Sequence, residues 1–458
     1  MFANNGLIAA MEEVENELPV NEAETAEVAV AVADETAEVQ KESDEAAVTV
    51  AQVEDAVQAG EELEEVAEVA VDAVESGEGL DETSAEMASI AIESIRNRLG
   101  FRGEQRLVPA MESFGNTNTR MTSTKLVIES IGDTIKKIWA AIKAAAARLW
   151  EKLKSFFAKL FNSATMLSKY IDGLRARARQ MPAGVKPAEK KLKAAAVARA
   201  FSVDGKASLS SAKVVLENTG KMAGVAEKIG EKQKDIAAAA SALASGEIDA
   251  DAVKKFLAAQ AAGNGALVQT MKQNFGEIDA GLAGLEMKGA KPKAGDKTIK
   301  VAFGPFVGSV ALGLTVAEGE FLGNKAVRAT MGFQAVKGKV AEEIEALELS
   351  EVNEILGIAS KLALGLQDFK KVQGNYDAIT KSIVKSADTV MNQAEKILDK
   401  TGSSAETRQG LQQLKTEIND TISTMGSFGN RAPALAFSCA KALADYASVS
   451  MRNLREGK

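Results

Sequence analysis

Histidine is absent from this chain of 458 residues, and cysteine occurs only once, as Cys439. Without histidine there is no imidazole metal site, no Ser/His/Asp or Cys/His nucleophile and no histidine proton relay, and one cysteine cannot form an intramolecular disulfide. There is also no GxxxxGK[ST] phosphate-binding loop, and no pair of carboxylates stands out for acid–base catalysis. We therefore predict no catalytic residues, no metal ligands and no bound cofactor, and we expect a protein that is not an enzyme.

Aromatic residues and proline are also scarce, at 5% of the chain and 7 residues respectively, whereas alanine is abundant. Four of the prolines, at 182, 187, 292 and 305, fall between stretches with helical periodicity. This composition is typical of a mostly helical protein and disfavours a sheet-rich fold. We predict an all-α class: a disordered acidic N-terminal leader, then a long amphipathic helix and elongated helical bundles.

Basic residues are rare at the start of the chain. Residues 1–112 contain 29 Asp and Glu but 5 Lys and Arg, so the totals of 64 and 55 leave 35 acidic and 50 basic residues beyond them. The first part is therefore net −24 and the remainder net +15. This division indicates an acidic leader joined to a basic body. The first residues carry four glutamates and lack the basic and apolar regions of a secretory signal.

The acidic leader is built largely from Val, Ala and Glu between residues 13 and 86, with a single lysine, Lys41. Such a segment repels itself and has no large side chains for a core, so we expect it to be disordered or transiently helical. Two interpretations follow. It is either a solvated acidic tail or a removable propeptide, and the second requires a processing signal.

A recurring pattern supplies a candidate signal. Three Ala-x-Glu tripeptides, ending at Glu75, Glu93 and Glu112, are each followed by serine, and Val127-Ile128-Glu129 precedes Ser130 in a related pattern. The tripeptide alone is common in this composition, so local exposure must select the site. Residues 100–124 are rich in glycine and polar residues and suit a protease. We favour cleavage after Glu112, with the predicted sites comprising Glu112, Ser113, Glu93 and Ser94.

The strongest helical periodicity lies in residues 128–161. At 100° per residue its large apolar side chains fall within one arc of about 140°. From Lys125 to Phe161 there are 8 basic and 3 acidic residues, with basic side chains mainly on the opposite side. Two interpretations stay open: an interfacial membrane-binding helix, or the central helix of a soluble bundle. The predicted membrane or partner face comprises Trp139, Trp150, Phe156, Phe157, Lys137 and Lys152.

The remaining chain divides by composition. We predict a basic amphipathic helix region at 113–181, a helical hairpin region at 182–290 with its turn and cap at Gly246–Asp249, a Gly-rich apolar segment at 291–341, and a C-terminal helical bundle at 342–458. Within that apolar segment, residues 301–317 are uncharged, and we favour a buried hairpin or irregular core segment over a short membrane span. We expect breaks between the C-terminal helices at Gly374, at 401–403 and at 429–430.

The acidic leader, the Ala-x-Glu-Ser sites at Glu93 and Glu112, and the sequence KKIWAAIKAAAARLWEKLKSFFAKLF together resemble the internal head, or ejection, proteins of giant tailed bacteriophages. The resemblance covers roughly residues 1–170. It implies a virion structural protein in the head that a prohead protease cleaves after the Glu of Ala-x-Glu. It further implies loss of the leader and a body kept with packaged DNA until delivery to the host cytoplasm. Val127 departs from the Ala-x-Glu pattern.

Implied partners are therefore the prohead protease, packaged DNA bound non-specifically through charge, other capsid or core proteins, and the host membrane. An alternative function is that of a membrane-binding or membrane-remodelling protein that acts through the cationic helix 128–161, with the acidic segment as an inhibitor. Processing after Glu112 would remove the acidic leader and leave a net +15 body beside DNA, which is an electrostatic switch.

Overall fold

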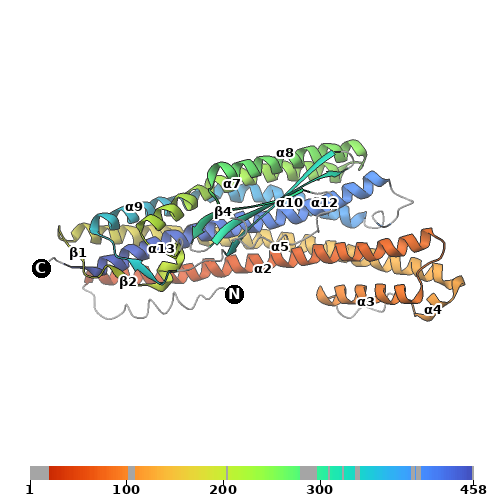
Figure 1. Cartoon of the computed structure of the whole chain (residues 1–458), viewed down its shortest axis with the longest axis horizontal. Helices are drawn as coiled ribbons and strands as arrows, with labels where there is room; N and C mark the ends of the chain where they lie inside the picture. The colour runs from red at the N-terminus through yellow and green to blue at the C-terminus, as the bar shows by residue number, and fades with distance from the viewer. Residues whose placement is uncertain are drawn as a thin grey trace.

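The computed structural model describes residues 20–101, 109–202, 205–278, 297–307, 310–321, 324–335, 341–393, 398 and 404–455. Long helices run side by side along an elongated molecule (Figure 1). The all-α class predicted from the sequence is confirmed. The helices have these bounds: α2 Val20–Glu75, α3 Glu82–Arg98, α4 Glu112–Gly115, α5 Thr117–Gln180, α6 Ala195–Phe201, α7 Leu209–Ser245, α8 Ala250–Asn274, α9 Leu349–Gly365, α10 Phe369–Asn392, α12 Ala405–Thr424 and α13 Ala432–Asn453.

The acidic segment is not disordered over the part that the structure describes, which corrects that prediction for residues 20–75. It forms α2, a helix of 56 residues that packs along α5. Two series of residues spaced seven apart supply the buried side of α2, as in a coiled coil. All members are buried except the half-buried Glu64; one series is Val39, Ala46, Val53, Gly60 and Ala67, and the other is Ser43, Val50, Val57, Glu64 and Val71.

The acidic segment is ordered, contrary to the expectation, because its small side chains can form a core when a neighbouring helix supplies the large ones. The Cβ that Gly60 lacks would lie 3.7 Å from Ile138 Cγ2 of α5, so the two helices approach closely at this point. The acidic side chains of α2 occupy mostly its outer side and edges. Burial of the Val/Ala stripe against α5 thus outweighs the repulsion among the carboxylates.

The helix predicted at 128–161 is confirmed and lies within α5, which contains 64 residues. Helices α2 and α5 are antiparallel with a constant register: Glu35 lies opposite Ser163, Glu45 opposite Lys152 and Gly60 opposite Ile138. Helix α5 also contacts α9, α10 and α13. It is therefore a central helix of the bundle.

The hairpin predicted after residue 182 is present as α7 and α8. Its turn ends at Asp249, whose side chain accepts a 2.7 Å hydrogen bond from the backbone N–H of Ala252. This is an N-cap, which satisfies one of the free N–H groups at the start of α8.

Two of the predicted C-terminal breaks are misplaced, and the third, at 401–403, lies outside the described residues. Gly374 lies inside α10, and the chain instead breaks before it at a short 3₁₀ helix, η1, Leu366–Asp368. Residues 429–430 do not interrupt the helix; they lie in a π-helical segment, η2, Met425–Arg431, that joins α12 directly to α13. At Gly374 the burial of other residues of α10, such as Val372 and Tyr376, outweighs the weak preference of glycine for breaks, and at Gly429 close packing against Tyr376 does so.

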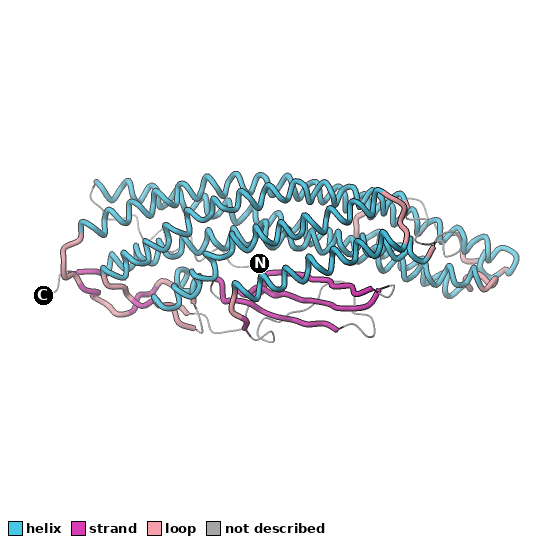
Figure 2. The backbone as a smooth tube through the Cα atoms, turned by 90° about the horizontal axis from the view of Figure 1, so that it is seen from above, coloured by secondary structure: helices cyan, strands magenta, loops and turns pink. Residues whose placement is uncertain are grey.

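The Gly-rich apolar segment forms an antiparallel sheet in the order β3-β4-β5-β6. Figure 2 shows its strands gathered along one side of the helices. Side chains from Ala311 to Val316 are buried, which agrees with the expected buried hairpin. The register of β4 with β5 shifts between Phe303 and Val307, where Pro305 cannot donate a ladder hydrogen bond. The strand bounds are β3 Glu277–Ile278, β4 Lys297–Val307, β5 Val310–Phe321 and β6 Asn324–Ala335.

Two short strand pairs tie the segment after α5 to later parts of the chain. Strand β1 pairs with β8 at the C-terminal end of α13, and β2 pairs with β7 just before α9. Within the described residues, we find no helix whose length and apolar character would allow it to cross a membrane. The bounds are β1 Lys186–Pro187, β2 Lys191–Lys193, β7 Glu343–Glu345 and β8 Leu454–Arg455.

Candidate processing site and the helix pair beside it

The favoured processing site lies in the connection between α3 and α5. Ala110 and Glu112 are exposed, whereas Met111 and Ser113 are half-buried. Glu112 begins α4, a helix of four residues, and the backbone N–H of Ser113 donates to the Ala110 carbonyl at 2.9 Å. The next residue, Phe114, is fully buried and fixes this turn to the bundle. The Glu112–Ser113 bond therefore lies in a short turn between two helices, with the Glu112 side chain exposed.

The second predicted site has a different setting. Glu93 and Ser94 are exposed, but they lie in the middle of α3 between Ile92 and Ile95, which are 1% and 4% exposed. Cleavage there requires unwinding of α3 and loss of these apolar contacts. The related site at Glu129 lies within α5, where Ser130 is buried. Of Glu93, Glu112 and Glu129, Glu112 has the least regular backbone around it.

The tripeptide that ends at Glu75 fits the pattern but is not among the predicted sites. Glu75 is the last residue of α2, and the exposed turn Ser76–Glu78 follows it, with Gly77 at a φ of 78°. This positive φ favours glycine and marks the sharp reversal into α3. In the sequence, Gly77, two positions after Glu75, is the signal that indicates a turn at this site. The Glu75–Ser76 bond is thus at least as exposed as the favoured one.

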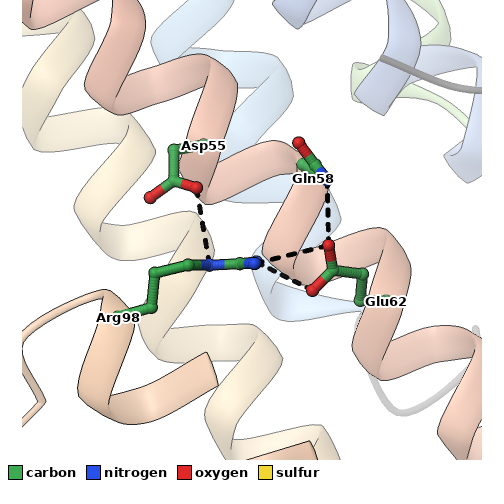
Figure 3. Close-up of polar contacts among 4 residues, drawn as sticks. All are labelled: Asp55, Gln58, Glu62 and Arg98. Atoms are coloured by element: carbon green, nitrogen blue, oxygen red, sulfur yellow. Dashed lines mark hydrogen bonds and ion pairs between the residues drawn. The ribbon is translucent and has the colours of Figure 1, made fainter. Parts of the chain in front are cut away.

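Helix α3 folds back on α2 and connects it to the processing site. Arg98 at the end of α3 donates to Glu62 through Nη2 at 2.8 Å, and its Nε lies 3.4 Å from Asp55, as Figure 3 shows. Gln58 Nε2 donates to Glu62 at 3.0 Å on the same side of α2. These groups are about one-third exposed or more, so each contact contributes little to stability. They join the C-terminal end of α3 to the side of α2.

The predicted membrane or partner face of α5 is buried within the chain. Trp139, Trp150, Phe156 and Phe157 are 1%, 8%, 0% and 0% exposed and belong to the hydrophobic core. Of the two lysines named with them, Lys137 is half-buried and Lys152 pairs with the acidic segment.

Two neighbours explain the unusual width of the apolar arc. Phe156 is eighteen residues, or five helical turns, beyond Ile138 and therefore lies on the side that contacts α2. Phe157 is rotated by about 100° toward the side of Lys143, which pairs with Asp388 of α10 at 2.6 Å. One flank of the arc thus packs against α2 and the other against α10.

A row of carboxylates on α2 lies against one edge of α5. Glu45 pairs with Lys152 at 2.7 Å, Glu38 pairs with Lys159, Glu35 accepts from Ser163 Oγ at 2.6 Å and Glu42 accepts from Ser155 Oγ at 3.4 Å. The hydrogen bond from Lys152, followed by its charge, lowers the pKa of the Glu45 carboxyl below its ordinary value. The acidic leader therefore occupies cationic groups of the body directly.

The body also makes three buried contacts with α2 from its C-terminal part. Lys415 of α12 pairs with Glu64, and the two side chains are 3% and 14% exposed. Asn430 Nδ2 of η2 donates to the Ser43 carbonyl at 2.6 Å. A Cβ on Gly426 of η2 would lie 2.6 Å from Val50 Cγ2, so only glycine fits there without a shift. Sequence reasoning missed these residues, although the seven-residue spacing that includes Ser43, Val50 and Glu64 marks a buried helix face.

The described residues contain no group of three or more Cys, Asp or Glu side chains arranged to hold a metal ion. Cys439 is fully buried, and burial raises the pKa of its thiol to about 12, so it is protonated at neutral pH and unreactive as a nucleophile. It packs as a small core residue.

Comparison with known proteins assigns the chain to a family. The family model of the phiKZ-like phage internal head proteins matches residues 27–449. The match runs far beyond residues 1–170, which carried the resemblance, and it includes most of α2. No curated protein and no solved structure matches the chain. Because the family match extends from α2 to α13, the chain belongs to the phiKZ-like phage internal head proteins.

Proposed function

We propose that this internal head protein is processed in the assembling head by the prohead protease, which cuts after Glu112. Membership of the family makes the chain a virion structural component that lies inside the phage head and associates with other head components. The proposal concerns how it is prepared there. The observation that carries it is the coincidence of the charge reversal near residue 112 with an exposed turn that joins the acidic and basic parts.

Charge complementarity supports an electrostatic role for the acidic part. Helix α2 contains 18 acidic residues and one basic residue, whereas α5 contains 13 basic and 4 acidic residues. While α2 is present, its carboxylates occupy Lys152 and Lys159. A body without residues 1–112 has a net charge of +15. We infer that this body neutralises phosphates of packaged DNA without sequence preference and is ejected with the DNA into the host cytoplasm.

The test is the N-terminal residue of the protein in mature particles, determined by terminal peptide mass spectrometry. The proposal predicts Ser113. Ser76 or Ser94 would show processing at another Ala-x-Glu site and contradict the choice of Glu112. An intact N-terminus that retains Met1 or Phe2 would contradict processing altogether.

DNA retention by full-length protein and by protein isolated without its leader, compared across a salt series, tests the electrostatic part. Protein without the leader should bind more tightly, with a steeper loss of binding as salt rises. Equal binding by the two forms would contradict a role of the leader in masking charge.

Membrane binding through residues 128–161 remains the alternative, and the composition of the face is the observation that favours it. Lysines flank a face of Trp, Phe, Ile and Leu side chains, as in helices that bind anionic lipid surfaces. In the folded chain α2 and α10 cover this face, so lipid can reach it only after one of them moves. Full-length protein should therefore not bind anionic vesicles. Binding by intact protein that is lost on replacement of Trp139 and Trp150 by alanine would favour the alternative.

A further inference from the structure

We propose that α2 stays bound to the body after the chain is cut between α3 and α5. The processed protein would then be a complex of two chains, an acidic one that carries α2 and a basic one that begins near α5. This inference rests on the proposed processing only for its occurrence in the phage; the binding itself follows from the contacts of the folded chain. Its consequence is that cleavage alone does not uncover α5.

The contact between α2 and the body is an interior contact. The buried stripe of α2, formed by the two series of residues spaced seven apart, includes Val39, Ala46, Val53 and Ala67, which are each 2% exposed or less. The large core residues of α5 cover the stripe from Glu35 to Gly60 in one register. An interface with the packing of a core, extended over much of a long helix, holds a peptide without a covalent link.

The body is also shaped for α2 at specific points. Gly426 leaves room for Val50, and Asn430, which is fully buried, donates to the Ser43 carbonyl. Lys415 has its carboxylate partner on α2, at Glu64. If α2 left, these buried polar groups would lose their partners, and each such loss is unfavourable. Departure of α2 therefore costs more than loss of apolar contact alone.

The exposed ion pairs contribute less and are sensitive to salt. Lys152 and Lys159 are 34% and 37% exposed in their pairs with Glu45 and Glu38. Raising the salt concentration to about 1 M shortens the Debye length to about 3 Å and weakens such pairs, but it does not weaken apolar contact. We therefore expect α2 to stay bound at high salt and to leave only when the body itself begins to unfold.

The family match gives independent support. It begins at residue 27 and thus includes α2 with the body in a single shared pattern. Because the family pattern includes α2, we infer that this helix is part of the shared fold and not a leader attached to a body that folds without it. Uncovering of α5 then requires a second event, such as further cleavage within α2 or unfolding of the complex, and the net +15 body of the proposed function forms only at that event.

The experiment uses the full-length chain with the recognition sequence of a sequence-specific protease inserted between Pro109 and Ala110. Both residues lie outside helices, and Ala110 is exposed. After the cut, gel filtration is run in low salt and in about 1 M salt. The expected result is that both fragments elute together in both buffers and separate in urea. If the acidic fragment elutes separately in low salt, the inference is overturned. If the two fragments elute together in low salt and separately in high salt, the claim that apolar contact holds the acidic fragment is overturned.

Variants within α2 make the test specific. Val39→Asp combined with Val53→Asp places two carboxylates in the buried stripe and should release the fragment after the cut. The matched control is Val48→Asp with Val69→Asp on the same helix, where the valines are 57% and 58% exposed, and it should leave the fragment bound. Circular dichroism of the uncut variants verifies that the body remains folded. Equal retention by the two pairs would overturn the assignment of the stripe as the contact surface.

Because an added protease makes the cut, the result does not depend on whether the prohead protease uses Glu112. An N-terminus other than Ser113 in particles would contradict the proposed function and leave the binding of α2 intact. Separation of the fragments in this experiment would contradict the present inference and leave processing intact. Anionic vesicles or DNA added to the cut protein should fail to displace α2, and displacement by either would overturn the inference.

Discussion

Replacement of Glu64 by alanine tests the buried contact between α2 and the body. Glu64 occupies a position in the buried stripe of α2, and its carboxylate pairs with Lys415, whose side chain is 3% exposed. Removal of one member of a buried ion pair leaves the other charge without compensation, at a cost of about 3–5 kcal/mol. We expect Glu64→Ala to lower the free energy of unfolding by about that amount, chiefly because Lys415 remains buried.

Two further variants separate this effect from a general loss of packing. Glu65→Ala, at the exposed neighbouring position, should change the free energy of unfolding by no more than about 0.5 kcal/mol. Glu64→Leu combined with Lys415→Met removes both charges, and it should be neutral or stabilising by about 1–4 kcal/mol. The double variant thus reports the cost of desolvating the pair.

Urea titration followed by tryptophan fluorescence is a suitable assay, because the two tryptophans of the chain, Trp139 and Trp150, both lie in α5. Far-UV circular dichroism of the same samples shows whether α2 and the rest of the bundle unfold together. If Glu64→Ala destabilises no more than Glu65→Ala, the reasoning is refuted, because Lys415 would then be compensated without α2.

Three other predictions concern the body and its contact with α2. Gly374→Ala should stabilise α10 by about 0.5–1 kcal/mol because no atom within 4 Å obstructs a Cβ there. Gly429→Ala should destabilise the protein by about 1–3 kcal/mol because its Cβ would overlap the Tyr376 ring. Thermal unfolding compares the two variants, and equal effects would contradict the close packing of η2. The Cys439 thiol, whose pKa burial raises to about 12, should not react with a thiol reagent at neutral pH until denaturant is added, and rapid reaction of native protein would contradict its burial. The pKa of Glu45 is lowered in the folded state, so its pair with Lys152 stabilises the fold above the unfolded pKa of the carboxyl, and this contribution is lost as pH falls through the folded pKa. Lys152→Gln should therefore destabilise the protein at neutral pH but not in acid. A difference in stability that does not change with pH would contradict this.

The amphipathic helix and the α7–α8 hairpin could be predicted because their signals are local. The spacing of large apolar residues places α5, and Asp249 marks the start of α8. The helix breaks expected at 374 and 429–430 were wrong because glycine disfavours a helix by only about 1 kcal/mol, and the packing of the helices exceeds this amount. Gly429 lies against the Tyr376 ring in a π-helical segment, and only the packed structure shows that contact.

The candidate site could be predicted in part. The sequence named Glu112 and its serine, but it gave Glu93 the same pattern, and only the structure distinguishes an exposed turn from the middle of a helix. The face with Trp139 and Phe156 was identified correctly as apolar. Its coverage by α2 could not be read locally, because the covering residues are alanine and valine in a segment whose charge suggested disorder.

By itself the sequence determined the charge division, the absence of histidine chemistry, the helical class and the long helix at the centre, since each follows from composition or from periodicity within one segment. The tertiary structure decided which surfaces remain open. Whether an acidic helix is solvated or buried depends on the partner face available to it, and that face lies on α5, α12 and η2, remote from α2 in the chain. Burial of small side chains against large ones is a property of the pair, so neither segment encodes it alone.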